Sequence, residues 1–225
     1  MGNYFKNHLN SNSFIFFNMK LIGHRGYKTE FIRENTFEAF TNALNNGFIG
    51  IECDVRETKD KKLVICHDAF IDRVSDGNGL LKNYTYEELT HFNFGSDDIP
   101  SKIPLLNDVL KLQGIKIVEL KERISLDTVL DIIDDDTYFI SFDTGYILGL
   151  KKKYPKLKFG ILNYGLNSIK DYDLDMICIL DMVATDRLVS SFTKKGVKVF
   201  VYGITGDINY KSEDENIFYI ADKKY

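Results

Sequence analysis

The sequence predicts an α/β fold and, within that class, a single-domain (β/α)8 TIM barrel. Eight short apolar runs alternate with helix-like stretches along the 225 residues, a pattern typical of parallel strands joined by helices. A further run, Leu63–Cys66, follows Ile49–Val55 after only a few residues. Because a parallel crossover needs about a dozen residues or more, we expect this run to double back as a hairpin strand in the second βα connection. An open doubly wound sheet is the alternative that the same pattern allows.

The expected barrel strands share a length of four to seven residues and a mostly apolar composition, both typical of strands buried on two faces. In chain order they are Lys20–Gly23, Ile49–Val55, Lys116–Leu120, Tyr138–Phe142, Lys158–Leu162, Met176–Leu180, Val197–Tyr202 and Ile217–Ile220.

The best-defined helix is expected between the first two strands. Asn35 can cap its first turn, Glu38 follows three residues later, and Gly47 is placed to end it. Its apolar face would carry Phe37, Phe40 and Leu44.

Two similar helices are expected further along the chain. One follows Thr85, which has Glu88 at the capping-box position, and the other follows Ser125. Helices between successive strands are what a parallel barrel requires.

The chain gives no indication of an internal domain boundary. It contains only three prolines, no low-complexity linker and no evident repeat. We therefore assign residues 19–225 to one barrel domain and residues 1–18 to an N-terminal leader. The leader's apolar run, Phe14–Phe17, is shorter than a signal-peptide core. We expect a disordered tail or an extra helix that closes the barrel floor, with a weak membrane contact as the remaining alternative.

The composition is that of a soluble globular protein, with 44% hydrophobic and 28% charged residues. A net charge of −4 gives no indication of nucleic-acid binding. No apolar stretch approaches the roughly 18–20 residues of a transmembrane helix, so we expect a cytoplasmic protein. The three cysteines, Cys53, Cys66 and Cys178, lie inside apolar runs, and we expect buried free thiols. The oligomeric state is left open.

Charged side chains gather at the ends of the first three expected strands, where the active sites of barrels lie. His24 and Arg25 follow the first strand, Glu52 and Asp54 close the second, and Glu119 and Lys121 close the third. The i, i+2 spacing within the second and third pairs places both members on one face of a strand.

The inward-facing acids predict a cation site. Glu52, Asp54 and Glu119 would repel one another unless a cation lay between them, and three carboxylates suit Mg²⁺ or Ca²⁺ better than Zn²⁺. His67 follows the hairpin run and, with His24, provides two groups that can transfer protons near neutral pH. Together these residues indicate metal-assisted cleavage of a phosphate ester.

Each residue also has a simpler interpretation when taken alone. A histidine at a strand end is more often a hydrogen-bonded structural residue than a catalyst, and Glu52 with Asp54 could simply be solvated. Glu119 and Lys121 could form a surface ion pair, and His67 could cap a turn. The functional interpretation depends on all of them occurring at strand ends together.

The stretch from Leu21 to Lys121 resembles the glycerophosphodiester phosphodiesterase family, a (β/α)8 barrel related to the phosphoinositide-specific phospholipases C. The order and spacing of the matching segments over about a hundred residues make the resemblance highly specific. They are Gly23-His24-Arg25-Gly26, Glu34-Asn35-Thr36-Phe37-Glu38-Ala39-Phe40, Gly50-Ile51-Glu52-Cys53-Asp54-Val55, Thr58-Lys59-Asp60, His67-Asp68, Arg73, Gly79, Ile103-Pro104-Leu105-Leu106 and Glu119-Leu120-Lys121, followed by Ser141-Phe142-Asp143.

The resemblance implies a role for each candidate residue. His24 and His67 would be the acid–base pair, while Glu52, Asp54 and Glu119 would hold a divalent cation, Mg²⁺ or Ca²⁺. Arg25 and Lys121 would bind the phosphate of a small glycerophosphodiester. It implies that the free glycerol hydroxyl attacks the phosphorus and releases the alcohol, and that water then opens the resulting cyclic phosphate to give glycerol 3-phosphate. The sequence does not assign acid and base between the two histidines.

The chain departs from the family at the edge of the pocket. Arg33 replaces the proline that usually precedes Glu-Asn-Thr, and Tyr202-Gly203 and Ala221-Asp222 replace Trp-Thr and Thr-Asp pairs near the C-terminus. Two alternatives therefore stay open. One is a phosphodiesterase for lysophospholipids or polymeric glycerophosphate, and the other is a phosphodiester-binding protein without turnover.

Overall fold

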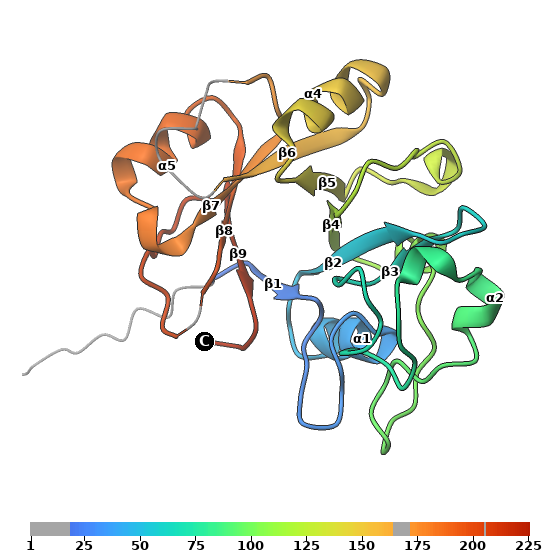
Figure 1. Cartoon of the computed structure of the whole chain (residues 1–225). Helices are drawn as coiled ribbons and strands as arrows, with labels where there is room; N and C mark the ends of the chain where they lie inside the picture. The colour runs from blue at the N-terminus through green and yellow to red at the C-terminus, as the bar shows by residue number, and fades with distance from the viewer. Residues whose placement is uncertain (1–18, 164–171, 205) are drawn as a thin grey trace, which may run out of the picture.

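The structure is a computed structural model that describes residues 19–163, 172–204 and 206–225 (Figure 1). Within these residues eight parallel strands close into a barrel, because β1 pairs with both β2 and β9. The predicted (β/α)8 barrel is confirmed, and the open doubly wound sheet is wrong because the strand order returns to its starting strand. The leader, residues 1–18, lies outside the described residues.

The strands agree with their predicted ranges to within two residues at each end. The barrel strands are β1 (Leu21–His24), β2 (Gly50–Glu57), β4 (Ile115–Leu120), β5 (Thr137–Ser141), β6 (Lys158–Asn163), β7 (Met176–Leu180), β8 (Lys198–Tyr202) and β9 (Ile217–Ala221).

The predicted hairpin is also confirmed. β3 (Leu63–Ile65) runs antiparallel to β2, with Val55 opposite Ile65 and Glu57 opposite Leu63. The turn is closed by Thr58, whose backbone N–H donates to the carbonyl of Lys62 at 2.9 Å.

Helices cover the outside of the ring of strands (Figure 1). α1 packs against β1 and β2, α4 against β5 and β6, and α5 against β8. The described helices are α1 (Phe37–Asn45), α2 (Tyr86–Leu89), α3 (Leu106–Val109), α4 (Thr144–Lys153) and α5 (Asp186–Thr193), with short 3-10 turns η1 (Leu81–Asn83), η2 (Leu130–Ile132) and η4 (Asp181–Val183).

The side chains alternate between the inside and the outside of the barrel, as expected for strands. Ile22, Tyr138 and Phe200 belong to a buried cluster that fills the barrel centre. Cys53 and Leu120 belong to a separate cluster between the strands and the helices. The centre is therefore a packed apolar core, and polar groups are confined to the two ends of the barrel.

The cap of α1 differs from the prediction. Thr36, not Asn35, is the N-cap, and its Oγ1 accepts a hydrogen bond from the backbone N–H of Ala39 at 3.2 Å. Asn35 has a left-handed backbone, with φ of 57°, and its amide points toward β2 instead. The later helix at Thr85 is confirmed, because α2 begins there with the predicted capping box to Glu88.

The prediction of a helix after Ser125 is wrong. This segment forms turns and the 3-10 helix η2. The hydroxyl of Ser125 bonds to Asp127 two residues on rather than capping a longer helix. The run 134–136 is entirely aspartate, and negative charge at a helix C-terminus opposes the helix dipole.

All three cysteines are buried and free, as predicted. Burial raises the pKa of Cys66 to about 12 and that of Cys53 well above its usual range. No helix in the described part of the chain combines the length and the apolar character needed to span a membrane.

Gly26 fixes the close approach of the β1–α1 segment to α1. Its φ is +84°, and an added Cβ would lie 2.6 Å from the Cβ of Ala39. Gly196 also has a positive φ, of +78°, but an added Cβ there would meet nothing within 4 Å. Substitutions at the two positions therefore distinguish the effect of backbone strain alone from that of strain with steric overlap.

We expect Gly196→Ala to lower the free energy of unfolding by about 1–2 kcal/mol, the usual penalty for a left-handed backbone. Gly26→Ala should lower it by about 3 kcal/mol or more, because overlap with α1 adds to that penalty. Urea denaturation of both variants measures the difference. Equal losses of unfolding free energy would show that α1 shifts at no cost to accommodate the added methyl group.

Candidate active site

The carboxyl ends of the strands surround a cavity of about 300 Å³. Six of the seven candidate residues line it, namely His24, Arg25, Glu52, His67, Glu119 and Lys121. The seventh, Asp54, is buried beside Glu52 and Glu119. The structure therefore brings together all the residues that the sequence singled out.

The strand register explains how the acids meet. Glu52 lies beside His24 in the β1–β2 pairing, and Asp54 lies beside Glu119 in the β2–β4 pairing. One carboxylate oxygen from each of Glu52, Asp54 and Glu119 lies within 4.8 Å of the others. Cys53, between the first two acids, faces the helices.

The acidic cluster has unusual electrostatics. Burial, with the charges of Asp54 and Glu119, raises the pKa of Glu52 well above its usual range. Burial and Asp54 also raise the pKa of Glu119, although the Lys121 ammonium opposes this effect. The Oδ1 atom of Asp54 is buried without a hydrogen-bond partner, and the nearest ammonium, that of Lys121, is 3.6 Å away.

These residues fit a divalent cation. Three oxygen ligands that converge from two adjacent strands match the preference of Mg²⁺ and Ca²⁺ for carboxylates. A cation would also satisfy the unpartnered oxygen of Asp54, since buried polar atoms are seldom left without a partner.

Each candidate histidine is held by its own carboxylate. The Nδ1 atom of His24 is 2.9 Å from Asp222, and that of His67 is 2.6 Å from Asp68. Burial alone would raise the pKa of Asp222, but His24 and Lys28 outweigh it and hold that pKa well below the usual range. Because the carboxylates stay ionised, each Nδ1 carries the proton and donates, which leaves Nε2 for chemistry in the cavity.

Two basic side chains lie beside the acids. Lys121 donates to Glu119 at 2.7 Å. Arg25 donates its backbone N–H to Glu52 at 3.0 Å, and its Nε lies 3.2 Å from Asp54. Burial alone would lower the pKa of Arg25, but the surrounding carboxylates outweigh it and raise that pKa. Arg25 therefore stays cationic, and both basic side chains line the cavity, where they can face an anion.

Glu34 connects the two histidine systems. Its Oε1 accepts from the guanidinium groups of Arg25 at 3.0 Å and Arg73 at 2.7 Å. Arg73 in turn donates to Asp68 at 2.6 Å, the carboxylate that holds His67. On the other side, Lys28 lies 3.9 Å from Glu34 and 2.8 Å from Asp222, the carboxylate that holds His24.

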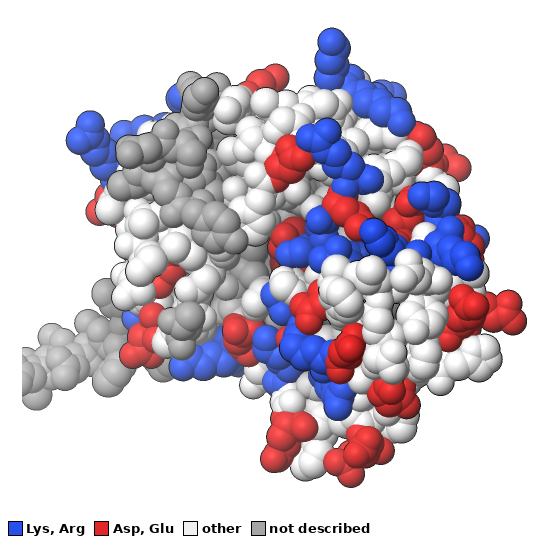
Figure 2. Space-filling view, viewed as in Figure 1, with Lys and Arg blue, Asp and Glu red and all other residues white. Residues whose placement is uncertain are grey.

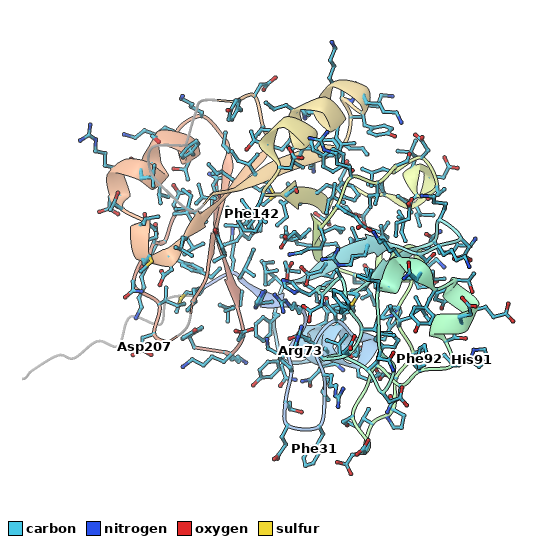
Figure 3. All side chains as sticks on the ribbon, viewed as in Figure 1. Phe31, Arg73, His91, Phe92, Phe142 and Asp207 are labelled. Carbon is cyan, nitrogen blue, oxygen red and sulfur yellow. The ribbon has the colours of Figure 1, made fainter. Side chains whose placement is uncertain are left out.

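The remaining wall of the cavity is apolar. Phe142 follows β5 at this face, where Figure 3 labels it, and its side chain is partly exposed. The other apolar residues of the wall are Ile140, Leu162, Tyr202, Ile204 and Ile220. Acids and cations thus occupy one side of the cavity and hydrocarbon the other.

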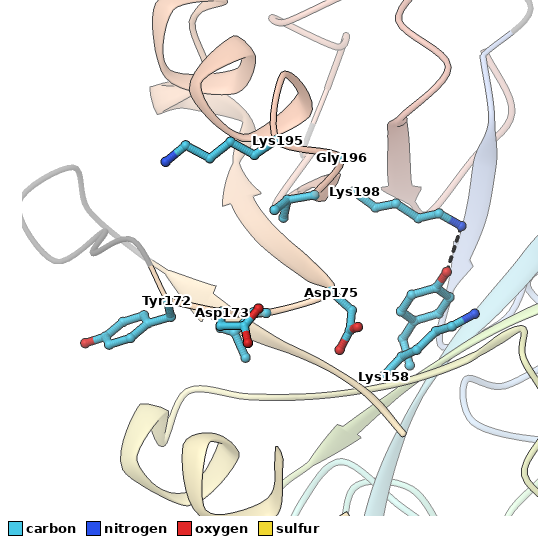
Figure 4. Close-up of a pocket in the computed structure, with 10 residues that line it drawn as sticks. Lys158, Tyr172, Asp173, Asp175, Lys195, Gly196 and Lys198 are labelled. Atoms are coloured by element: carbon cyan, nitrogen blue, oxygen red, sulfur yellow. Dashed lines mark hydrogen bonds between the residues drawn. The ribbon is translucent and has the colours of Figure 1, made fainter. Parts of the chain in front are cut away.

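A larger hollow of about 610 Å³ lies at the opposite end of the barrel (Figure 4). Lys158, Asp175 and Lys198 line it, and the Lys198 ammonium donates to the hydroxyl of Tyr138 at 2.7 Å. None of its lining residues is a histidine, and it lies away from the acidic cluster. We therefore place the candidate active site at the carboxyl end.

Sequence reasoning did not assign roles to several residues that organise the site. Asp222 directly follows β9, and its position after a strand was the available indication. Asn35 was interpreted as a cap, yet its amide donates to Asp54 at 2.8 Å. Glu34 and Asp68 lie in recognised motifs, but the link between them runs through Arg73, which is 39 residues from Glu34 in sequence.

Comparisons with known proteins agree with this geometry. Residues 24–135 match the model of the glycerophosphoryl diester phosphodiesterase family. A glycerophosphodiester phosphodiesterase of Caldanaerobacter subterraneus is 34% identical over 160 residues, which are 63% of this chain and 65% of that protein. One from Bacillus altitudinis is 43% identical over 97 residues, 41% of this chain and 39% of that protein. The chain thus matches less than two thirds of the length of either relative.

Solved structures share the fold. The glycerophosphodiester phosphodiesterase of Thermotoga maritima superposes with a TM-score of 0.74 at 28% identity, covering 90% of this chain and 93% of that one. An Oleispira antarctica phosphodiesterase, solved in complex with the product sn-glycerol-3-phosphate, gives a TM-score of 0.72 at 23% identity. That match covers 83% of this chain and 85% of the other.

We expect cation binding to depend on pH. The raised pKa values of Glu52 and Glu119 favour protonation, so Mg²⁺ or Ca²⁺ has to displace protons, and affinity should rise with pH above 4.5, the ordinary glutamate value. The same shifts mean that the cation-free protein loses stability as pH rises through this range. Calorimetry in buffers of different ionisation enthalpy detects the released protons. Asp54→Asn should weaken binding, whereas Glu57→Gln on the same strand should not.

We expect Glu34→Gln to lower the free energy of unfolding by about 1–3 kcal/mol at pH 7, because Arg25 and Arg73 lose a shared charged partner. Burial alone would raise the pKa of Glu34, but the two arginines outweigh it and lower that pKa. The stabilisation is therefore present above pH 4.5 and disappears as pH falls through the lowered pKa. Urea denaturation at several pH values measures it. Glu38→Gln, which faces the neutral Ser101, is the control.

Proposed function

We propose that this chain acts as a member of the glycerophosphoryl diester phosphodiesterase family and hydrolyses glycerophosphodiesters to glycerol 3-phosphate and an alcohol. The observation that carries this proposal is that two carboxylate-held imidazoles line the same 300 Å³ cavity as the acidic cluster. The product complex of the Oleispira phosphodiesterase supports a small glycerol phosphate as the ligand of this fold.

We assign the cation to Glu52, Asp54 and Glu119. When bound, it would neutralise charge on the non-bridging phosphate oxygens and lower the pKa of an attacking hydroxyl. Mg²⁺ and Ca²⁺ both suit this donor set.

His24 and His67 are proposed as the acid–base pair. One imidazole Nε2 takes the proton of the attacking hydroxyl, and the other protonates the departing alkoxide. The carboxylates of Asp222 and Asp68 hold the rings and stabilise the imidazolium that forms in turn. Arg25 and Lys121 would bind the phosphate, since both are cations at the cavity wall.

The apolar wall supports a second candidate substrate. Ile140, Phe142 and Leu162 offer a surface on which an acyl chain could lie, so a lysophospholipid is the alternative that this wall favours. A polymeric glycerophosphate, or binding without turnover, has no comparable supporting contact. Three buried free thiols suit a reducing compartment, and we propose that the protein acts in the cytoplasm.

Purified protein with Mg²⁺ or Ca²⁺ should release glycerol 3-phosphate from glycerophosphocholine, as measured by a coupled dehydrogenase assay. His24→Ala and His67→Ala should each lower kcat by about 10²–10⁴-fold, the usual contribution of a general acid or base. Excess chelator should abolish turnover. His91→Ala, an exposed histidine outside the site, is the matched control.

Activity that survives both His24→Ala and chelator would contradict the mechanism. Cleavage of a lysophospholipid would leave an acylated glycerol phosphate, so choline release from lysophosphatidylcholine, compared with choline release from glycerophosphocholine, decides between the two substrates. A higher kcat/KM for the acylated compound would favour the alternative.

A further inference from the structure

A second hollow adjoins the active cavity. It has a volume of about 180 Å³ and lies between the β1–α1 segment and the segment that follows β3. Three cations, Lys28, Arg33 and Arg73, line it together with one acid, Glu34. In Figure 2 basic side chains gather at the place where Figure 3 labels Arg73. The lining is basic although the whole chain carries a net charge of −4.

The single acid of the hollow is already occupied. Glu34 is mostly buried, and its Oε1 accepts from both Arg25 and Arg73. It therefore orients Arg73 rather than offering a free carboxylate to a cationic ligand.

The cations keep unused donors. Arg33 is exposed and forms no ion pair, and its guanidinium makes no hydrogen bond, among the described residues. All five of its N–H groups are thus available. Arg73 uses Nε and NH2 for Asp68 and Glu34, which leaves its NH1 group unused. Such donors match the oxygens of a phosphate or carboxylate.

The wall that carries Arg33 is fixed by its own hydrogen bonds. The N–H of Thr29 donates to the carbonyl of Ile32 at 3.1 Å, and the Thr29 hydroxyl accepts from the N–H of Ile32. The carbonyl of Arg33 accepts from the hydroxyl of Thr36 at 2.8 Å. A fixed backbone lowers the entropy lost when a ligand binds.

A single carboxylate connects a cation of the hollow with each candidate histidine. Lys28 contacts Asp222, the partner of His24. Arg73 contacts Asp68, which holds the other imidazole. A substrate whose phosphodiester lies between the imidazoles can therefore extend its alcohol group from the active cavity into this hollow.

We propose that the hollow binds a second anionic group, a phosphate or a carboxylate, on the alcohol half of the substrate. This inference rests on the proposed function and narrows its substrate class. Glycerophosphodiesters whose alcohol carries additional negative charge are preferred over those with a neutral alcohol.

The test compares kcat/KM for glycerophosphoglycerol with that for two analogues whose terminal hydroxymethyl group bears a phosphate or is oxidised to a carboxylate. The native protein should favour at least one anionic analogue by about five- to tenfold, as expected for hydrogen bonds to a charged group. Arg33→Gln should lower this ratio by about threefold or more, and Arg33→Lys by less. The two analogues distinguish phosphate from carboxylate recognition.

Arg187→Gln is the matched control, because Arg187 is also exposed and without an ion pair among the described residues but lies on α5. Its ratio should equal that of the native protein. The inference is overturned if the native protein gives neither anionic analogue a higher kcat/KM than glycerophosphoglycerol. It is also overturned if Arg33→Gln and Arg187→Gln show the same preference.

Absence of turnover on every compound would instead contradict the proposed function. Calorimetric binding of the phosphorylated analogue then decides the inference separately. Arg33→Gln should weaken that binding by about threefold or more relative to Arg187→Gln, and equal affinities overturn it. Competition by inorganic phosphate measures whether the hollow also takes the free anion.

Discussion

Mutual repulsion among three crowded carboxylates is the constraint on which this end of the barrel depends. Glu52, Asp54 and Glu119 project inward because they alternate with apolar residues on β2 and β4, so the fold itself forces them together. Both Arg25 and Asn35 adopt left-handed backbones, with φ of 56° and 57°, and each brings a donor to these acids. The cost of backbone strain in the β1–α1 segment is thus offset by hydrogen bonds to the buried carboxylates.

Closure of the barrel sets the partners of the histidines. His24 and Asp222 are 198 residues apart in sequence but lie on neighbouring strand ends, because β1 pairs with β9. His67 instead finds its carboxylate next door, in Asp68. The two imidazoles reach equivalent environments by different routes, and Glu34 links them through Arg73 and Lys28. An alteration at Glu34 would therefore reach both rings.

The sequence predicted most of what depends on local pattern. Strand positions follow from apolar runs, and the inward direction of Glu52 and Asp54 follows from their spacing. It failed where the outcome depends on distant groups: Asn35 is recruited by a carboxylate on β2 instead of capping α1. The helix after Ser125 failed because three consecutive aspartates oppose its C-terminal end. The sequence places Asp222 at a strand end, but its pairing with His24 exists only once the ring of strands closes.

The division of the cavity follows from the same topology. β1, β2 and β4 supply the charged side, whereas Ile140, Leu162 and Ile220 extend the apolar centre of the barrel to its mouth on the other strands. A low-dielectric wall opposite the acids strengthens every charge interaction in the cavity. The burial of Glu52, together with the charges of Asp54 and Glu119, makes this acid costly to ionise, as its raised pKa indicates. The burial that disfavours ionisation of these acids would therefore also strengthen their interaction with a cation held against an anionic substrate.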